Sequence, residues 1–200
     1  MSYSSCLADA EGELMLDTSV FISLSASGVA VEVLQALPQP ALIVDVAASE
    51  VTVDARTGRP DGDILQSLLA SPTLNLVKLD ATGLALFEKL VLVLDDGEAA
   101  TIAASAGRRA IAILDERRAR RVCTQELPDT RQASTVDLFA HPAVRHDLGS
   151  DRLAEAVHAA LQYARLHVRE DQRDWVVGLI GRDRAAACNS IPGWQQLRES

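Results

Sequence analysis

The stretch from Leu14 to Ile22 constrains the fold of this chain most. A short apolar run ends in Asp17, Thr18 and Ser19 follow, and a second apolar run begins directly after them. This order is typical of a buried strand that leads into a helix, and it predicts a helix cap formed by the hydroxyl of Thr18 or Ser19. In open α/β sheets, ligands bind at the carboxyl ends of strands. We therefore expect Asp17 to lie where chemistry takes place.

The rest of the chain alternates short apolar runs with segments of helical periodicity. The runs predicted to be strands are Glu13–Asp17, Ala41–Val44, Leu74–Leu79, Ala110–Leu114 and an edge strand within Asp129–Thr135. Helices are predicted between them, and Arg56–Asp63 is predicted to be a loop because of its glycine, proline and aspartate residues. This alternation predicts an α/β fold in three α/β/α layers, with a central, mostly parallel sheet of four or five strands.

The last part of the chain is predicted to be helical. From Leu153 to Val168, apolar residues recur at spacings of three and four, which predicts an amphipathic helix. We expect residues 1–148 to form one domain and residues 149–200 a C-terminal helical extension packed on it. This stripe and the helices predicted between Val20 and Leu37 have more apolar surface than such a sheet can cover. We therefore expect exposed apolar surface that marks an interface.

Charge and targeting signals limit the functions that are open to the chain. The net charge is −9, so binding of nucleic acid requires a local basic patch. Six arginines flank the fourth predicted strand: Arg108, Arg109, Arg117, Arg118, Arg120 and Arg121. They form either a phosphate-binding patch beside Asp115 or a solvated face paired with nearby acids. Met1–Gly12 lacks the features of a signal peptide, and no apolar run is long enough to cross a bilayer, so we expect no membrane association and a cytoplasmic location.

Four acids fall near the ends of predicted strands. Asp17 and Asp115 follow strands directly, Glu50 lies in the helix after the second strand, and Glu98 opens a later helix. Carboxylates brought together repel one another unless a cation offsets their charge, and oxygen ligands select Mg²⁺ or Mn²⁺. A metal of this kind activates water for attack on a phosphodiester. The alternatives are that Glu98 only complements the helix dipole and that Glu50 lies on a solvated helix face.

The order and spacing of these acids resemble a known family. The matching runs are Leu16-Asp17-Thr18-Ser19, then Glu50, then Gly97-Glu98-Ala99-Ala100-Thr101-Ile102-Ala103, and then Ile113-Leu114-Asp115-Glu116-Arg117-Arg118-Ala119-Arg120. Together they look like a PIN domain, and they are closest to the VapC-like branch whose members carry a Gly-Glu-Ala helix start and an acid-acid-Arg-Arg run. The resemblance covers about Glu13 to Ala140. The Arg56–Asp63 loop and the C-terminal extension exceed the compact toxin form.

The resemblance implies an endoribonuclease that depends on Mg²⁺ or Mn²⁺, with an RNA substrate. The implied catalytic and metal-binding residues are Asp17, Glu50, Glu98 and Asp115, the accessory residues are Thr18, Ser19, Asp96 and Glu116, and we assign RNA binding to Arg117, Arg118 and Arg121. Many bacterial members are toxins of toxin–antitoxin pairs and form two-fold dimers, so a homodimer and a small antitoxin partner are expected. The alternative is a PIN-like binding or scaffold protein without catalytic activity.

Overall fold

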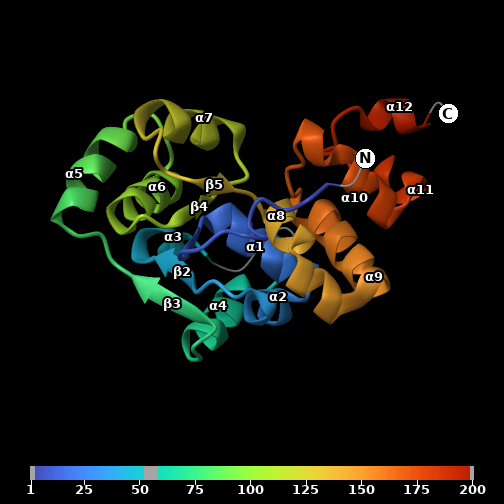
Figure 1. The fold of residues 1–200 in the computed structure, drawn as a ribbon, viewed down its shortest axis with the longest axis horizontal. Helices are drawn as coiled ribbons and strands as arrows, with labels where there is room; N and C mark the ends of the chain where they lie inside the picture. The colour runs from blue at the N-terminus through green and yellow to red at the C-terminus, as the bar shows by residue number, and fades with distance from the viewer. Residues whose placement is uncertain (1–2, 52–57, 199–200) are drawn as a thin grey trace.

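The computed structural model describes residues 3–51 and 58–198. Its centre is a sheet of five strands, all parallel, in the order β3-β2-β1-β4-β5 (Figure 1). The strands are β1 (Leu14–Leu16), β2 (Ala41–Val44), β3 (Leu74–Val77), β4 (Ile111–Ile113) and β5 (Gln132–Ala133). The predicted parallel sheet is confirmed, and each strand is as long as or shorter than the apolar run that predicted it.

Helices connect the strands and continue to the end of the described chain. They are α1 (Thr18–Ser27), α2 (Ala30–Ala36), α3 (Asp45–Glu50), α4 (Asp61–Leu69), α5 (Ala81–Leu90), α6 (Asp96–Arg108), α7 (Arg117–Glu126), α8 (Thr135–Ala140), α9 (Pro142–Ala159), α10 (Arg173–Ile180), α11 (Arg182–Ala185) and α12 (Trp194–Arg198). A π-helical turn, η1 (Ala160–Ala164), and a 3₁₀ turn, η2 (Glu170–Gln172), lie between α9 and α10.

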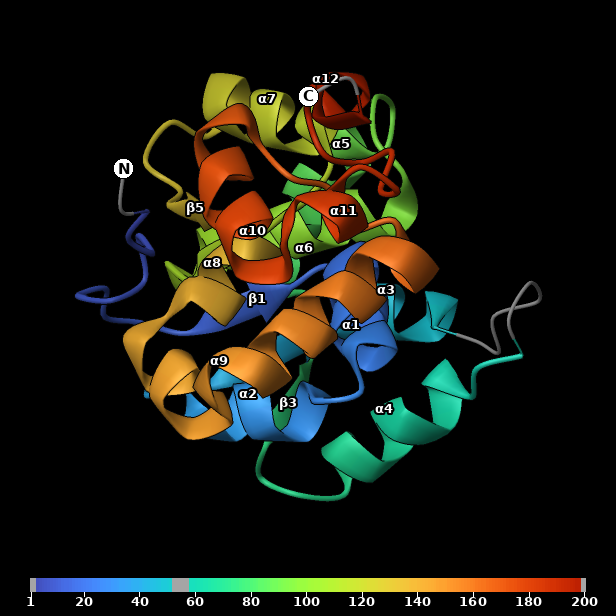
Figure 2. The ribbon, with the colours of Figure 1, turned by 90° about the vertical axis from the view of Figure 1, so that its right-hand side faces the viewer.

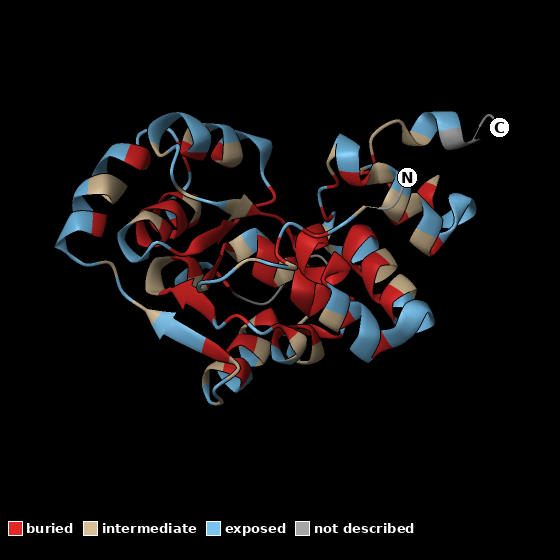
Figure 3. Ribbon diagram, in the orientation of Figure 1, coloured by how far each residue is buried: buried red, intermediate tan, exposed pale blue. Residues whose placement is uncertain are grey.

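The strands β1, β2 and β4 are buried on both faces, as expected for the middle of three layers, whereas β3 is exposed at Asn75 and Leu76. Successive side chains of a strand point to opposite faces. Accordingly Ile111 and Ile113 of β4 join the core that contains α1, α2 and the C-terminal helices. Ala112 and the following Leu114 join a second core formed with α5, α6 and α7. Figure 3 shows the resulting band of buried residues through β1 and β4.

The strand order reverses between β1 and β4. The chain places β2 and then β3 on one side of β1, and it places β4 and β5 on the other. The reversal leaves the residues after β1 and β4 next to each other, and the Asp17 amide donates to the carbonyl oxygen of Ile113 at 3.3 Å. Ligands of open α/β sheets bind at such a switch point. The two acids that directly follow strands, Asp17 and Asp115, therefore lie at the position where a site is expected.

The C-terminal helices cover α1 and α2. Figure 2 shows α9 crossing in front of both. Leu153, Val157 and Leu161, which belong to the predicted apolar stripe, are at most 3% exposed. The prediction that this stripe and the α1–α2 helices leave apolar surface exposed is therefore wrong, because the two sets of helices bury each other. Helix α9 also runs through the predicted domain boundary, with a break at Gly149, whose φ is 68°.

Two local predictions differ from the structure. Asp17 is itself the N-cap of α1, accepting from the Ser19 amide, so the predicted cap by Thr18 or Ser19 is wrong. An aspartate at this position has the same acceptor geometry as a hydroxyl and competes for the same amide. Helix α4 begins at Asp61, inside the predicted loop, because Asp61 is buried and accepts from the Ser25 hydroxyl at 2.5 Å. The part of that loop at residues 56–57 lies outside the described residues.

No single helix in the described chain is long and apolar enough to cross a membrane. Taken together, α1 and α2 have the length and apolar composition of a membrane span, but the two helices are bent by 111° relative to each other.

Candidate acidic site

Asp17 is at the centre of the site. Its side chain is 3% exposed, and Oδ2 accepts from the Ser19 amide at 3.2 Å and from the Ser19 hydroxyl at 2.6 Å. The other oxygen, Oδ1, is buried and has no hydrogen-bond partner in the described residues. Burial raises the pKa of Asp17, and the nearby charge of Glu50 raises it further. A buried carboxylate oxygen without a donor is costly, so Oδ1 is available to a ligand.

Glu50 joins three elements at the edge of the site. Its Oε2 accepts from the Thr18 hydroxyl at 2.7 Å, and its Oε1 accepts from the Gly97 amide at 2.9 Å. That amide belongs to the first turn of α6, where a carboxylate satisfies an orphan N–H group and complements the helix dipole. A Cβ atom at Gly97 would lie 2.7 Å from Thr18 Oγ1 and still closer to Glu50 Oε2. Only glycine at residue 97 allows this close approach.

Asp115 is held by a residue that follows the next strand. Its Oδ1 accepts from the Thr135 amide at 2.8 Å, and its Oδ2 accepts from the Thr135 hydroxyl at 2.7 Å. Burial raises the pKa of Asp115 to about 6, although the two bonds from Thr135 oppose the rise; the negative charge of Asp17 adds to it. Asp115 is therefore fixed in orientation, while its negative charge is not fully offset.

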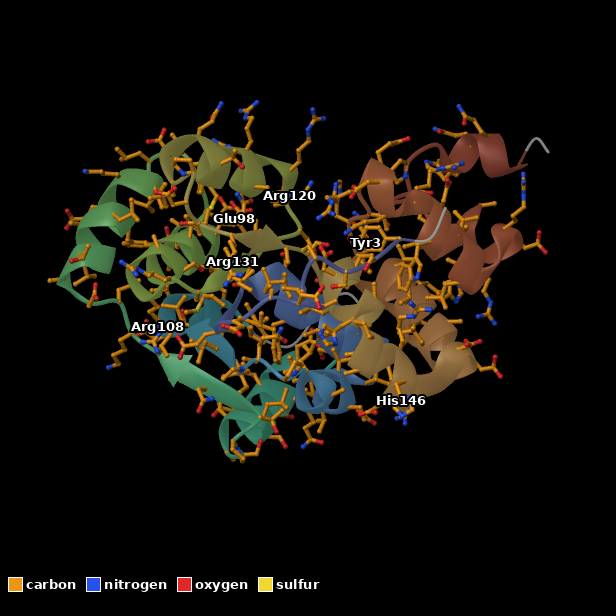
Figure 4. All side chains as sticks on the ribbon, in the orientation of Figure 1. Tyr3, Glu98, Arg108, Arg120, Arg131 and His146 are labelled. Atoms are coloured by element: carbon orange, nitrogen blue, oxygen red, sulfur yellow. The ribbon has the colours of Figure 1, made fainter. Side chains whose placement is uncertain are left out.

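Glu98 completes the group from the first turn of α6. Burial raises its pKa to about 7, and the charges of Asp17 and Glu116 add to the rise. Figure 4 shows Glu98 between α6 and α7. The negative charge of Asp17 thus raises the pKa of both Asp115 and Glu98. Titratable groups whose pKa values are shifted together in this way are typical of functional sites.

The donor set fits a hard divalent cation. A cation would relieve the repulsion among Asp17, Glu98 and Asp115, and it would supply the partner that Asp17 Oδ1 lacks. Among residues 3–51 and 58–198, no three acidic, histidine or cysteine side chains form a ready-made metal-binding group. Mg²⁺ is usually held through one or two carboxylates and keeps several of its waters. When bound, such a metal polarises a phosphoryl oxygen and lowers the pKa of a bound water.

The protein's own residues would prepare this chemistry. Ser19 and Thr135 orient the carboxylates of Asp17 and Asp115, and Thr18 orients Glu50. Ionised carboxylates at the end of the sheet can hold a hydrated cation and accept protons from its water. The predicted accessory residues differ in their placement: Thr18 and Ser19 contact the acids directly, Glu116 is the exposed N-cap of α7, and Asp96 is exposed at the start of α6.

The six predicted arginines do not form one patch. Arg108 and Arg109 precede β4 and lie at the opposite end of this strand from Asp115, which follows it. Arg108 donates to Glu13 at 3.0 and 3.1 Å. The four arginines of α7 remain on the side of Asp115. Arg117, Arg118 and Arg121, to which RNA binding was assigned, are exposed there, whereas Arg120 is partly buried.

Sequence reasoning missed two residues of the site. Thr135 holds both oxygens of Asp115, yet it is twenty residues away in the chain. The only signal for it was the capping pattern of Ser134 and Asp137, which marks the start of a helix at Thr135. Gly97 was noted only as part of a motif, because its role depends on how close Glu50 comes to α6.

One comparison with known proteins gives a result. A family model described as a PIN domain matches residues 13–128, which is more than half of the chain and includes all four acids. The match ends before β5, Thr135 and the C-terminal helices. No curated protein and no solved structure matches the chain.

Proposed function

This chain belongs to the PIN domain family, whose members are generally nucleases, and on that premise we propose that it is an endoribonuclease dependent on Mg²⁺ or Mn²⁺. One observation carries the proposal: Asp17, Glu98 and Asp115 have raised pKa values through burial and mutual repulsion, and the buried Oδ1 of Asp17 lacks a partner. A bound divalent cation resolves both features and supplies the activated water that phosphodiester hydrolysis needs. Glu50 is the fourth acid of the proposed metal site, held near Asp17 through Thr18.

The test is cleavage of single-stranded RNA with Mg²⁺, with Mn²⁺ and with EDTA, beside single-stranded DNA of the same sequence. We expect metal-dependent cleavage of the RNA, none in EDTA, and loss of cleavage in Asp17→Asn. The matched control is Asp80→Asn, since Asp80 caps α5 by accepting from Gly83 as Asp17 caps α1. Equal activity in Asp17→Asn and wild type, or cleavage that persists in EDTA, contradicts the proposal.

A second candidate is a PIN-like protein that binds RNA or a partner without catalysis. The lack of a ready-made group of three metal ligands in the described residues favours it. The same assay separates the two candidates, because a binding protein retains RNA affinity and cleaves in none of the metals.

Three finer parts of the proposal concern its biological setting. We propose a role as the toxin of a toxin–antitoxin pair, a homodimer, and a small antitoxin partner. Four exposed apolar residues support a protein contact: Leu76 on β3, Leu84 on α5, and Leu92 and Val93 just after α5. Growth arrest on expression of wild type but not of Asp17→Asn tests the toxin role. Light scattering tests the dimer, and a monomer at high micromolar concentration removes it.

A further inference from the structure

The four arginines of α7 do not have the same surroundings. The helix begins two residues after Asp115, and three of its arginines point into solvent. Arg120 instead lies on the side of α7 that faces the C-terminal helices (Figure 4). Its Nη1 is buried and has no hydrogen-bond partner within the described parts of the chain. A guanidinium has five donors, and a buried donor without an acceptor costs free energy.

Among the described residues, the acids around Arg120 offer its Nη1 no hydrogen bond. Burial, and then the like charge of Arg169, lowers the pKa of Arg120, although Asp115, Asp171 and Asp137 oppose this. Those acids already have partners. Arg169 donates to both oxygens of Asp171 at 3.0 and 2.9 Å and to Asp137 at 3.2 Å, while Asp115 accepts from Thr135. Arg120 is thus a cation beside Asp115 whose charge the neighbouring acids do not fully offset.

The segment from Arg165 to Arg169 borders this position. His167 is exposed and interacts electrostatically with Arg120, Glu116 and Arg117, so it lies near the start of α7. This segment belongs to the C-terminal extension and lies outside the residues that match the family. The extension therefore approaches the start of α7, which begins two residues after Asp115.

We propose that Arg120 binds a backbone phosphate of the RNA strand, next to the phosphodiester held at the acids, in a position bordered by His167. The inference rests on the proposed ribonuclease function and adds a substrate contact to it. A phosphate offers two oxygens in the geometry that a guanidinium fork matches, and its negative charge offsets the repulsion between Arg120 and Arg169. The competing explanation is that Arg120 serves only as an internal counter-charge for Asp115.

The experiment measures binding of a short, fluorescein-labelled single-stranded RNA by anisotropy in EDTA, over a series of KCl concentrations. We expect Arg120→Gln to weaken binding about tenfold, as for the loss of a hydrogen bond between charged groups. We expect it to reduce the salt slope by about 0.7, the value for one phosphate of a single strand. Arg120→Lys should keep the slope and recover part of the affinity, because lysine retains the charge but not the fork.

A set of RNAs with one neutral methylphosphonate each then locates the contact. In wild type, one position should cost about as much affinity as Arg120→Gln does, and in Arg120→Gln that position should cost nothing more. Arg182→Gln is the control for the change in charge, because Arg182 is exposed on α11. Inorganic phosphate at matched ionic strength should compete only weakly, since a strand makes further contacts. Competition by free phosphate as strong as that by RNA contradicts a strand contact.

The outcomes distinguish the phosphate contact from the ribonuclease function. Equal affinity and slope for wild type and Arg120→Gln, or identical methylphosphonate profiles, overturns the phosphate contact. A lower cleavage rate at saturating RNA with unchanged affinity also overturns it and assigns Arg120 to Asp115. If RNA binds with the expected dependence on Arg120 but no metal supports cleavage, the contact stands and the ribonuclease function fails. A wild type that binds no RNA overturns the phosphate contact, and if it also cleaves no RNA with either metal, the ribonuclease function fails as well.

Discussion

Asp115 and Asp137 are two buried aspartates near the start of α8, and their pKa values are shifted in opposite directions. Asp115 accepts two hydrogen bonds, both from Thr135, and burial raises its pKa to about 6. Asp137 is also fully buried, but it accepts from Tyr3 at 2.5 Å, from the Ser134 amide and hydroxyl, and from Arg169 and Gln172. Burial alone would raise the pKa of Asp137, yet these bonds and the charge of Arg169 lower it.

The difference separates a carboxylate that is available to a ligand from one that holds the fold. Asp137 ties the N-terminal segment, α8 and the C-terminal extension together through its partners Tyr3, Ser134, Arg169 and Gln172. Buried charges stabilise a protein only when their partners are complete. Asp115 has no cationic hydrogen-bond partner among the described residues, and the like charge of Asp17 is close to it. Helix α8 connects the two, because its first residue is Thr135 and its capping residues are Ser134 and Asp137.

The largest expected effect is on catalysis. Asp115→Asn should reduce RNA cleavage about a hundred- to a thousandfold, as for removal of one main electrostatic group. The fold should stay intact, because the Thr135 amide can donate to the new carbonyl oxygen and the Thr135 hydroxyl can accept from the new amide. Single-turnover cleavage and circular dichroism measure the two effects. Retained cleavage, or unfolding of this variant, would break the contrast with Asp137.

The next effect is on stability. Asp137→Asn should lower the free energy of unfolding by about 3 kcal/mol, because removal of one partner of a buried ion pair leaves the other uncompensated. In the asparagine variant, an NH₂ group replaces one carboxylate oxygen. It cannot accept the hydrogen bonds that this oxygen accepts in the wild type. Urea unfolding of both variants tests this. If Asp115→Asn and Asp137→Asn are equally stable, the distinction between the two aspartates is false.

The pH dependence of stability should reveal Asp115 separately. Its pKa is about 6 in the folded protein and near 3.8 unfolded, so the native state binds more protons between these values, and stability falls as pH rises from about 4 to 6. Asp137, with its lowered pKa, contributes stability that is lost only below about pH 4. The stability of Asp115→Asn relative to wild type should therefore increase by about 3 kcal/mol between pH 4 and 8.

Metal binding should depend on pH through Glu98 and Asp115. Mn²⁺ should raise the melting temperature more at pH 8 than at pH 5, since Glu98 and Asp115 must lose protons before they hold a cation. Asp115→Asn should show a smaller rise, and Asp80→Asn should match wild type. A rise that does not depend on pH would mean that the cation binds elsewhere.

The smallest expected effect concerns the close contact at Gly97. In Gly97→Ala the new Cβ would collide with Glu50 Oε2 and Thr18 Oγ1. We expect Glu50 to move and cleavage to fall about ten- to a hundredfold, as for loss of a residue that orients a metal ligand. The matched control is Gly178→Ala on α10, which is exposed and has open space for a Cβ. It should gain stability by about 0.5 to 1 kcal/mol and keep full activity.

Periodicity in the sequence was enough for the fold class, since the apolar runs predicted to be strands contain the five strands and the helices alternate with them. It also placed Asp17 and Asp115 at strand ends, because that position depends on local order alone. The predicted apolar stripe from Leu153 to Val168 is helical only as far as Ala164, and the sequence did not reveal what it packs against. A stripe shows that a face is buried and does not show against what, and here it packs on α1 and α2.

Only the tertiary structure decided which polar residues act together. Asp115 and Thr135 share two hydrogen bonds because β4 and β5 are neighbours, and Glu50 meets Gly97 because α3 packs on α6. The tertiary structure also places Arg108 and Arg120, which look alike in sequence, beyond opposite ends of β4. Hydrogen bonds act over about 3 Å and screened charges over about 10 Å, and the sequence does not reveal distances between residues far apart in the chain. The sequence alone determined that Asp17 and Asp115 follow strands. The packing of strands and helices decided which acids have complete hydrogen-bond partners and which remain available to a ligand.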